Sequence, residues 1–260
     1  MTFALGGDRI MIERSDVEGI AILKLARGKA NAMDIELCQA VIDAFRSLQT
    51  SLAKAVILSG EGGMFSAGVD LIRTSAGGPD YVRKFLPVLN AMFDAVFHFP
   101  RPVIAAVNGH AIAGGCVLAC CADYRVMAQG NGRIGITELL VGLPFPALAF
   151  EVMRFATTPR FFPQAVYGGQ THLSDGGLER GWIHEVVPAT ELIDRALAVA
   201  RGLAALPAIT FATTKRQLHA DVLARMEKDG AATDAAVIDV WASSEAQGRI
   251  RDYVARTLKK

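Results

Sequence analysis

The 260-residue sequence lacks the features that would place it in a membrane, on nucleic acid or outside the cell. No stretch approaches the roughly 20 consecutive apolar residues that a membrane-spanning helix needs. The 27 basic and 26 acidic residues leave a net charge of +1, so the chain has no broad basic surface for nucleic acid. We therefore expect a cytoplasmic protein whose partners include neither a membrane nor a nucleic acid.

Cysteine is sparse, and metal-ligand spacing is missing. The chain has four cysteines, Cys38, Cys116, Cys120 and Cys121. Their apolar neighbours predict buried thiols in a reducing compartment rather than a disulfide framework. His110 lies near three of them, but at a spacing that does not suit a metal ion, so no metal site is expected. Residues 1–10 lack the basic and apolar regions of a signal peptide, and no targeting segment is expected there.

Strands and helices alternate over the first two thirds of the chain. Short β-type runs are predicted near residues 10–13, 19–25, 55–58, 103–107, 124–127 and 133–136, the first two as a hairpin joined by residues 15–18. Helices are predicted over residues 35–50, with Asp34 as N-cap, and from Gly77-Gly78-Pro79 to Phe99. This alternation is typical of an α/β fold with right-handed crossovers and a parallel sheet.

The last third of the sequence is predominantly helical. Helices are predicted near residues 147–157, 159–167, 174–180, 189–205, 207–226 and 230–258, with one weak strand over residues 182–187. Helices without strand partners suit a cap over the core or a contact between subunits.

Two glycine-containing loops carry the strongest local signal. Residues 103–107 predict a buried strand, and Gly109, Gly114 and Gly115 then allow a tight turn into an apolar helix. The start of such a helix presents free N–H groups that suit an anion or a developing oxyanion. A second loop, at residues 65–70, also follows an apolar strand. If both lie at the same ends of neighbouring parallel strands, their N–H groups meet at one point, although tight packing turns would give the same pattern.

The two loops resemble the crotonase superfamily, which comprises the enoyl-CoA hydratases and isomerases. The matching motifs are Phe65-Ser66-Ala67-Gly68-Val69-Asp70-Leu71, Val107-Asn108-Gly109-His110-Ala111-Ile112-Ala113-Gly114-Gly115-Cys116 and Cys121-Ala122-Asp123-Tyr124-Arg125, followed by weaker matches at residues 173–174, 181–188 and 214–215. The resemblance implies an α/β, ββα spiral core over residues 1–200 and a helical C-terminal trimerisation region over residues 201–260. It also implies a homotrimer, or a hexamer built as a dimer of trimers.

The resemblance further implies an acyl-CoA thioester as substrate, with coenzyme A as part of that substrate and no separate cofactor. By position, the backbone N–H groups of Val69 and Gly114 match the oxyanion hole that polarises the thioester carbonyl. The adenine pocket of the family corresponds to backbone around Lys29, Ala30, Ala32 and Ala67.

The reaction class depends on the acidic residues. Hydratases of the family use two glutamates, but here Val117 occupies the first position and only Glu138 remains at the second. Adding water is best served by two groups, whereas moving a double bond needs one base that removes a proton at carbon 2 and returns it at carbon 4. The pattern is similar to the 3,2-trans-enoyl-CoA isomerase branch. Burial among Ile136, Leu139, Leu140 and Val117 is expected to raise the pKa of Glu138.

Several alternatives remain at this point. A hydratase using Glu138 alone, another crotonase-fold enzyme and a non-catalytic acyl-CoA binder are the other functions to be tested. Val117, Leu139 and Phe145 are expected to contact the acyl chain, although Phe145 could equally pack in the core. The equivalents of Tyr253 and Arg256 in relatives reach coenzyme A on a neighbouring subunit.

Residues 130–135 match a dinucleotide-binding fingerprint, but they lead into an extended segment rather than a helix. No nicotinamide cofactor is therefore expected.

Overall fold

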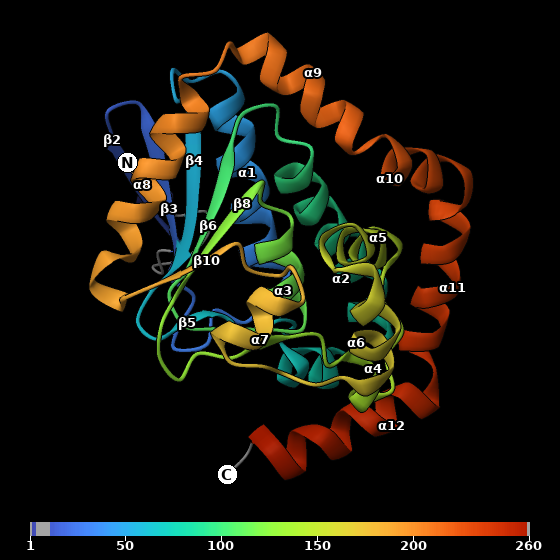
Figure 1. Ribbon diagram of the computed structural model, residues 1–260. Helices are drawn as coiled ribbons and strands as arrows, with labels where there is room; N and C mark the ends of the chain where they lie inside the picture. The colour runs from blue at the N-terminus through green and yellow to red at the C-terminus, as the bar shows by residue number, and fades with distance from the viewer. Residues whose placement is uncertain (1, 4–10, 259–260) are drawn as a thin grey trace.

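The computed structural model describes residues 2–3 and 11–258, and Figure 1 shows its central sheet with helices on both faces. Within those residues a seven-stranded sheet has the order β1-β2-β3-β4-β6-β8-β10. The strands are β1 (Thr2–Phe3), β2 (Ile12–Val17), β3 (Ile20–Leu25), β4 (Ala55–Gly60), β6 (Val103–Val107), β8 (Tyr124–Ala128) and β10 (Glu185–Val187). The first three are antiparallel, and every pair from β3 to β10 is parallel, which confirms the predicted parallel sheet.

The hairpin between β2 and β3 turns later than predicted. Its tight turn consists of Glu18 and Gly19, both with positive φ, so the turn predicted at residues 15–18 is wrong. A two-residue turn of this kind matches the twist of antiparallel strands, and Ser15 and Asp16 lie within β2. Ile10, the predicted start of the first strand, lies outside the described residues.

Both glycine loops contain short strands that the sequence did not predict. They form a second, parallel sheet of β5 (Met64–Ser66), β7 (His110–Ile112) and β9 (Ile134–Gly135). β9 lies within the strand predicted at residues 133–136, whereas residues 64–66 and 110–112 were expected as loops, because strands of three residues next to glycine carry no periodic signal. The small sheet brings residues 64–66 and 110–112 side by side.

The helices that follow β3 and β5 begin at aspartate caps. Asp34 accepts a hydrogen bond from the N–H of Leu37 at the start of α1 (Ile35–Gln49), as predicted. Asp70 caps α2 (Leu71–Phe97) in the same way, so the start predicted at Gly77 is wrong. The glycines there instead form a kink inside α2, where Gly78 has a φ of 60°.

Two apolar layers lie on the two faces of the main sheet. Along β4, Val56 and Leu58 point into the larger core beneath α1, α2 and α3 (Gly114–Cys120), whereas Ala55 and Ile57 face α8 (Leu192–Ala204). Strands buried on both faces explain the continuous apolar runs in the sequence. Cys38, Cys116, Cys120 and Cys121 are buried free thiols, as predicted.

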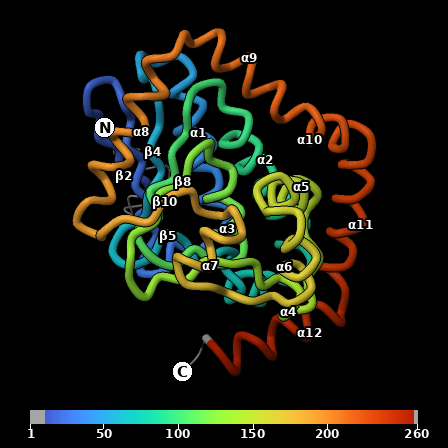
Figure 2. Tube along the Cα trace, viewed as in Figure 1, coloured from blue at the N-terminus to red at the C-terminus, as the bar shows by residue number. Residues whose placement is uncertain are grey.

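The remaining helices form the C-terminal half of the fold. They are α4 (Glu138–Val141), α5 (Ala147–Ala156), α6 (Phe162–Gly168), α7 (Ser174–Glu179), α9 (Ala208–Leu218), α10 (Ala220–Arg225), α11 (Ala231–Ala242) and α12 (Ser244–Tyr253), with single π-helical turns at Met226–Gly230 and Val254–Leu258. Figure 2 shows the trace from α9 to α12 as an arc around the outside of the fold. None of the described helices could cross a membrane alone by length and composition, and one sharply bent pair, over residues 189–204 and 208–218, could do so only together.

Candidate active site

A central cavity of about 370 Å³ opens between the two glycine loops and the helices that cover them. The loops, α2, α3, α4 and α5 form its walls, and α11 and α12 add one aromatic side chain each. It is lined by Ala30, Ala32, Ala67, Val69, Asp70, Leu71, Ile72, Leu89, Phe93, Ile112, Ala113, Gly114, Val117, Thr137, Glu138, Val141, Leu143, Pro146, Ala149, Trp241 and Tyr253.

Two backbone amides lie side by side in the wall of this cavity, those of Val69 and Gly114. A Cβ placed on Gly114 would lie 3.8 Å from the nitrogen of Val69, and one placed on Gly68 would lie 3.0 Å from the nitrogen of Gly114. Each amide follows a residue with positive φ, 80° at Gly68 and 51° at Ala113. A residue with positive φ therefore precedes each of the paired amides.

The neighbouring amides donate hydrogen bonds within the described part of the protein, whereas the amides of Val69 and Gly114 do not. The N–H of Gly68 donates to the hydroxyl of Ser66, and the N–H of Asp70 donates to the carbonyl of Met33. On the other loop, the N–H of Ala113 donates to the carbonyl of Gly135. Among the described residues neither Val69 nor Gly114 has an acceptor for its N–H, so two free donors remain at one point. Such a pair suits an oxygen that gains negative charge.

The loops can approach this closely only because glycine stands at the contact. A Cβ on Gly115 would lie 2.2 Å from the carbonyl oxygen of Ser66. The predicted need for glycine in the second loop therefore has a steric cause.

Glu138 begins α4 and presents its carboxyl group to the same cavity. Its Oε2 atom is buried and has no hydrogen-bond partner. Desolvation raises the pKa of Glu138 to about 7, against a smaller lowering by the backbone N–H groups at Glu138 and Thr137. The predicted direction is confirmed, but the predicted surroundings are partly wrong because Leu139 and Leu140 are exposed.

The cavity wall contains one other carboxylate. Asp70 uses its Oδ1 to accept the N–H of Arg73 at the start of α2. Val117, which the sequence places where a second glutamate would stand, is buried and lines the cavity. Glu138 is therefore the one cavity carboxylate, among the described lining residues, with an unpartnered buried oxygen.

The structure brings most of the predicted site residues together. Val69, Gly114, Glu138 and Val117 line the cavity, as do Ala30, Ala32 and Ala67. Three predicted contact residues do not line the cavity, namely Lys29, Leu139 and Phe145.

Leu139 and Phe145 line a separate outer groove of about 590 Å³, on the other side of residues 138–150. The prediction that they face the cavity is wrong because α4 and the turn after it point alternate side chains to opposite sides. Phe145 is buried, so it packs in the core, the other reading of its role.

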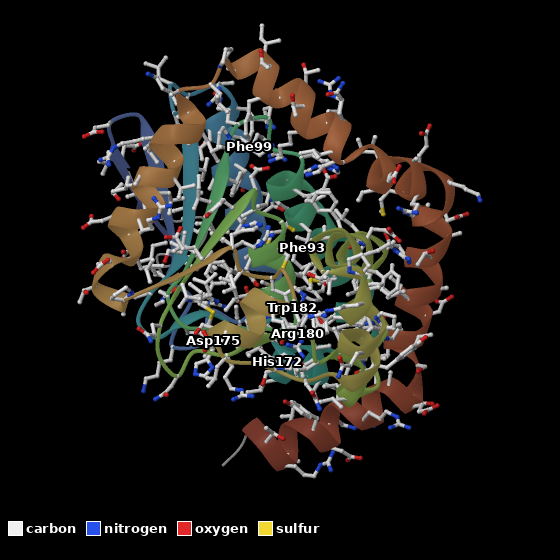
Figure 3. The ribbon with its side chains drawn as sticks, viewed as in Figure 1. Phe93, Phe99, His172, Asp175, Arg180 and Trp182 are labelled. Carbon is white, nitrogen blue, oxygen red and sulfur yellow. The ribbon has the colours of Figure 1, made fainter. Side chains whose placement is uncertain are left out.

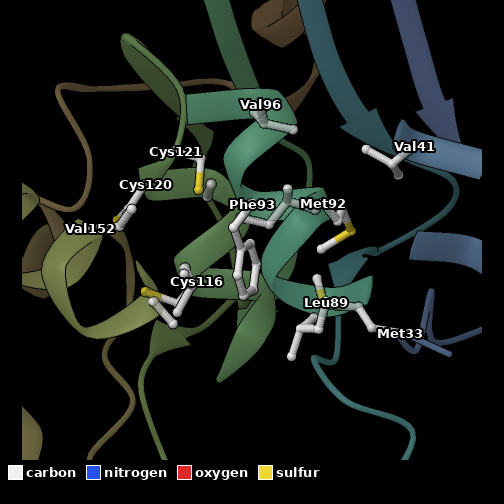
Figure 4. Close-up of a cluster of buried hydrophobic side chains, with 14 of the residues drawn as sticks. Met33, Val41, Leu89, Met92, Phe93, Val96, Cys116, Cys120, Cys121 and Val152 are labelled. Carbon is white, nitrogen blue, oxygen red and sulfur yellow. The ribbon is translucent and has the colours of Figure 1, made fainter. Parts of the chain in front are cut away.

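Several cavity residues were not predicted. Leu89 and Phe93 on α2, both labelled in Figure 4, gave no signal beyond an ordinary apolar helix stripe. Trp241 and Tyr253 come from the C-terminal helices, more than 100 residues away from Val117. Tyr253 reaches the cavity of its own chain, whereas the sequence suggested contact with a neighbouring subunit.

Residues 130–135 end in the short strand β9 rather than opening a helix, so the glycines there do not present the start of a helix to a dinucleotide. In the described part of the chain, no three side chains of histidine, cysteine, aspartate or glutamate gather to hold a metal ion.

Comparison with known proteins gives a consistent result. A model of the enoyl-CoA hydratase/isomerase family matches residues 15–256. The chain is 27% identical over 214 residues to enoyl-CoA delta isomerase 1, mitochondrial, of Mus musculus, covering 81% of this chain and 74% of that protein. It is 32% identical over 196 residues to a probable enoyl-CoA hydratase of Mycobacterium tuberculosis, covering 74% of each.

A solved structure shares the fold over nearly the whole chain. Human mitochondrial delta3-delta2-enoyl-CoA isomerase superposes with a TM-score of 0.91 at 21% identity, covering 96% of this chain and 98% of that one, a likeness that shows the fold alone. Taken with the family match over residues 15–256, the chain belongs to the enoyl-CoA hydratase/isomerase family, within the crotonase superfamily and close to its enoyl-CoA isomerases.

Proposed function

We propose that this protein is an enoyl-CoA isomerase that moves a double bond from position 3 to position 2 of an acyl-CoA thioester. The observation that carries the proposal is the carboxylate of Glu138, whose buried Oε2 has no hydrogen-bond partner among the described residues, in a cavity where Val117 takes the place of a second acid. One base suffices for a 1,3-proton transfer, whereas hydration is best served by two.

The reaction follows from the cavity geometry. The thioester oxygen accepts hydrogen bonds from the N–H groups of Val69 and Gly114. The carboxylate of Glu138 removes a proton from carbon 2, and the electron pair delocalises into a dienolate whose charge rests on that oxygen. The protonated Glu138 then returns the proton to carbon 4, which leaves the double bond between carbons 2 and 3. A single donor to such an oxyanion is typically worth about a hundred- to a thousand-fold in rate.

The pKa of Glu138 suits this role. A base with a pKa of about 7 is partly ionised at neutral pH and still binds a proton strongly enough to remove one from carbon. We expect kcat/KM to rise with pH and to level off above about pH 7.

The rest of the proposal concerns binding and assembly. Backbone at Ala30, Ala32 and Ala67 lies at the cavity and holds the coenzyme A portion, and no further cofactor takes part. The exposed apolar side chains of α9, among them Ile209 and Leu218, support a homotrimer or a hexamer of two trimers. The four buried free cysteines suit a reducing compartment and support a cytoplasmic location.

The test is an assay of two substrates with one variant and one control. The wild-type protein is expected to convert a 3-enoyl-CoA to the 2-enoyl-CoA without taking up water, and to hydrate crotonyl-CoA at least a hundredfold more slowly. Glu138→Gln is expected to lower kcat by about a thousandfold or more while the Kd for a saturated acyl-CoA changes little. Asp70→Asn keeps the helix cap and is expected to stay within about fivefold of wild type.

The other outcomes point to the alternatives. Faster hydration of crotonyl-CoA than isomerisation would show a hydratase. Tight acyl-CoA binding without turnover would show a non-catalytic binder.

A further inference from the structure

Residues 138–150 form a thin wall between the central cavity and the outer groove. Along this segment Val141, Leu143, Pro146 and Ala149 line the cavity. Their neighbours Leu139, Pro144, Phe145, Ala147 and Phe150 line the groove. On α11 the same division separates Trp241, in the cavity, from Val237, in the groove. One layer of side chains therefore closes the cavity on this side.

The cavity has an open end and a closed end. Its small residues Ala30 and Ala32, together with the exposed Ile72, lie toward solvent. Five of its larger or helix-borne residues are almost completely buried, namely Leu89, Phe93, Leu143, Ala149 and Trp241. A thioester whose coenzyme A portion enters at the open end therefore directs its acyl chain toward the closed end.

Trp241 is fixed in place at the closed end. Its indole N–H donates to the carbonyl oxygen of Pro144 at 2.9 Å, and Gln247 donates to its backbone carbonyl, also at 2.9 Å. A second tie joins α11 to the wall, because Asp234 accepts the N–H of Ala147 at 2.8 Å. Trp241 as a whole residue is 2% exposed. Since Pro144 itself lines the groove, the indole stands where the cavity would otherwise continue outward.

We propose that Trp241 sets the longest acyl chain that the protein accepts, as a fixed stop at the end of the cavity. The inference rests on the proposed acyl-CoA function. Each added methylene should improve kcat/KM about fourfold until the chain reaches the indole, after which kcat/KM should fall. Chains that end before the indole fit, and longer ones must displace a side chain held by a hydrogen bond.

Three variants test the stop from both directions. We call the chain length at which kcat/KM stops rising the break. Trp241→Leu shortens the stop, so the break moves to longer chains. Just beyond the wild-type break, Trp241→Leu should exceed wild type at least tenfold. Trp241→Ala joins the cavity to the outer groove, so the upper limit disappears. Ala149→Leu fills the closed end and moves the break to shorter chains.

Trp182 supplies the matched control. It is fully buried and donates its indole N–H to Thr157, but it lines neither the cavity nor the groove. Figure 3 places it beside His172 and Arg180. Trp182→Phe should leave the break where the wild type has it.

The experiment measures two quantities for each folded protein. One is kcat/KM for 3-enoyl-CoA thioesters of 6 to about 16 carbons, and the other is the Kd of saturated acyl-CoA thioesters of the same lengths by titration calorimetry. A break that moves in the Kd series supports the stop even if no isomerisation occurs, so failure of the proposed function is seen separately. The same break in wild type, Trp241→Leu and Ala149→Leu overturns the proposal. If the tryptophan variants do not fold, Ala149→Leu decides.

Discussion

The C-terminal helices attach to the rest of the chain in two different ways. In α9 the single buried residue is Lys215, and Ile209 and Leu218 are 83% and 64% exposed. In α11 and α12 the buried residues are mostly apolar, with Trp241 and Ile250 in the main core. The region predicted as one unit over residues 201–260 thus contains two parts. We call α9 the arm, and α11 with α12 the cap.

The arm is held by charge and the cap by apolar packing. Lys215 Nζ lies 2.8 Å from Asp123 Oδ2, and that oxygen also accepts the N–H of Val103. Burial lowers the pKa of Lys215 and raises that of Asp123, against their mutual attraction. An ion pair of this kind fixes where α9 sits but adds little net stability, whereas apolar burial stabilises the cap directly. The difference suggests that the cap completes the cavity and that the arm is placed for an external contact.

An isoleucine-to-alanine substitution in the cap and one in the arm should give the largest contrast in the free energy of unfolding. Ile250→Ala, in the cap, should lower the free energy of unfolding by about 2–5 kcal/mol, because it leaves a cavity in the core. Ile209→Ala, in the arm, should change the free energy of unfolding of the isolated chain by less than about 0.5 kcal/mol. Urea unfolding followed by circular dichroism measures both. Equal effects at low protein concentration would mean that arm and cap are held alike.

Outside the arm and the cap, much of the site could be predicted from the sequence. The paired loops were predictable because glycine positions and flanking apolar strands are local features, whereas Glu138 was predicted only through the resemblance to the crotonase superfamily. Asp34 was predictable as a cap because a helix cap is also a local feature.

The rest depended on tertiary geometry. Leu139 faces the groove because α4 is a single short helical turn, whose orientation no periodicity can set. Tyr253 reaches its own cavity only because α12 folds back beside α2 and α4. An apolar stripe shows that a helix is buried but not against which wall, so Trp241 and Phe93 were missed.

Breaking the ion pair should show how the arm is held. Lys215→Met leaves Asp123 buried without its partner, so it should lower the free energy of unfolding by about 3 kcal/mol. Adding Asp123→Asn removes the uncompensated charge and should restore most of the loss. A double-mutant cycle by urea unfolding measures the coupling. Additive losses would show that the two charges act independently.

Burial of Glu138 in the cavity that the cap completes should lower the free energy of unfolding at high pH. Its pKa is about 7 in the native state against 4.5 for the free side chain, so the native state holds more protons between those pH values and stability falls as pH rises through that window. Glu138→Gln should therefore be more stable than wild type by about 3 kcal/mol at pH 8 and equal to it near pH 4. Thermal unfolding at both pH values measures this. A variant less stable at pH 8 would mean that the carboxylate is well solvated.

The arm's exposed face should govern assembly. Ile209→Glu combined with Leu218→Glu places charge on a surface proposed to meet another subunit, so the subunit dissociation constant should rise at least about tenfold, or 1.4 kcal/mol. Light scattering coupled to size-exclusion chromatography measures the mass. Activity per chain of the smaller species should remain, because the cavity is lined from one chain. An unchanged mass would place the subunit contact elsewhere.

The smallest effect is expected where the arm joins the next helix. His219 follows α9 and stacks on Phe97, with 3.7 Å between the ring centroids. Burial lowers the pKa of His219 to about 3, and repulsion from Lys215 and His98 adds to this lowering. As pH falls below 6.5 the unfolded chain takes up a proton that the native state refuses, so stability falls with acid. His219→Phe keeps the stacking and removes the titration, so between pH 7 and pH 5 it should lose about 1 kcal/mol less stability than wild type. Urea unfolding across that range measures the difference. Parallel pH curves for the two proteins would mean that the imidazole is open to solvent, and that the arm moves away from the core more easily than its ion pair suggests.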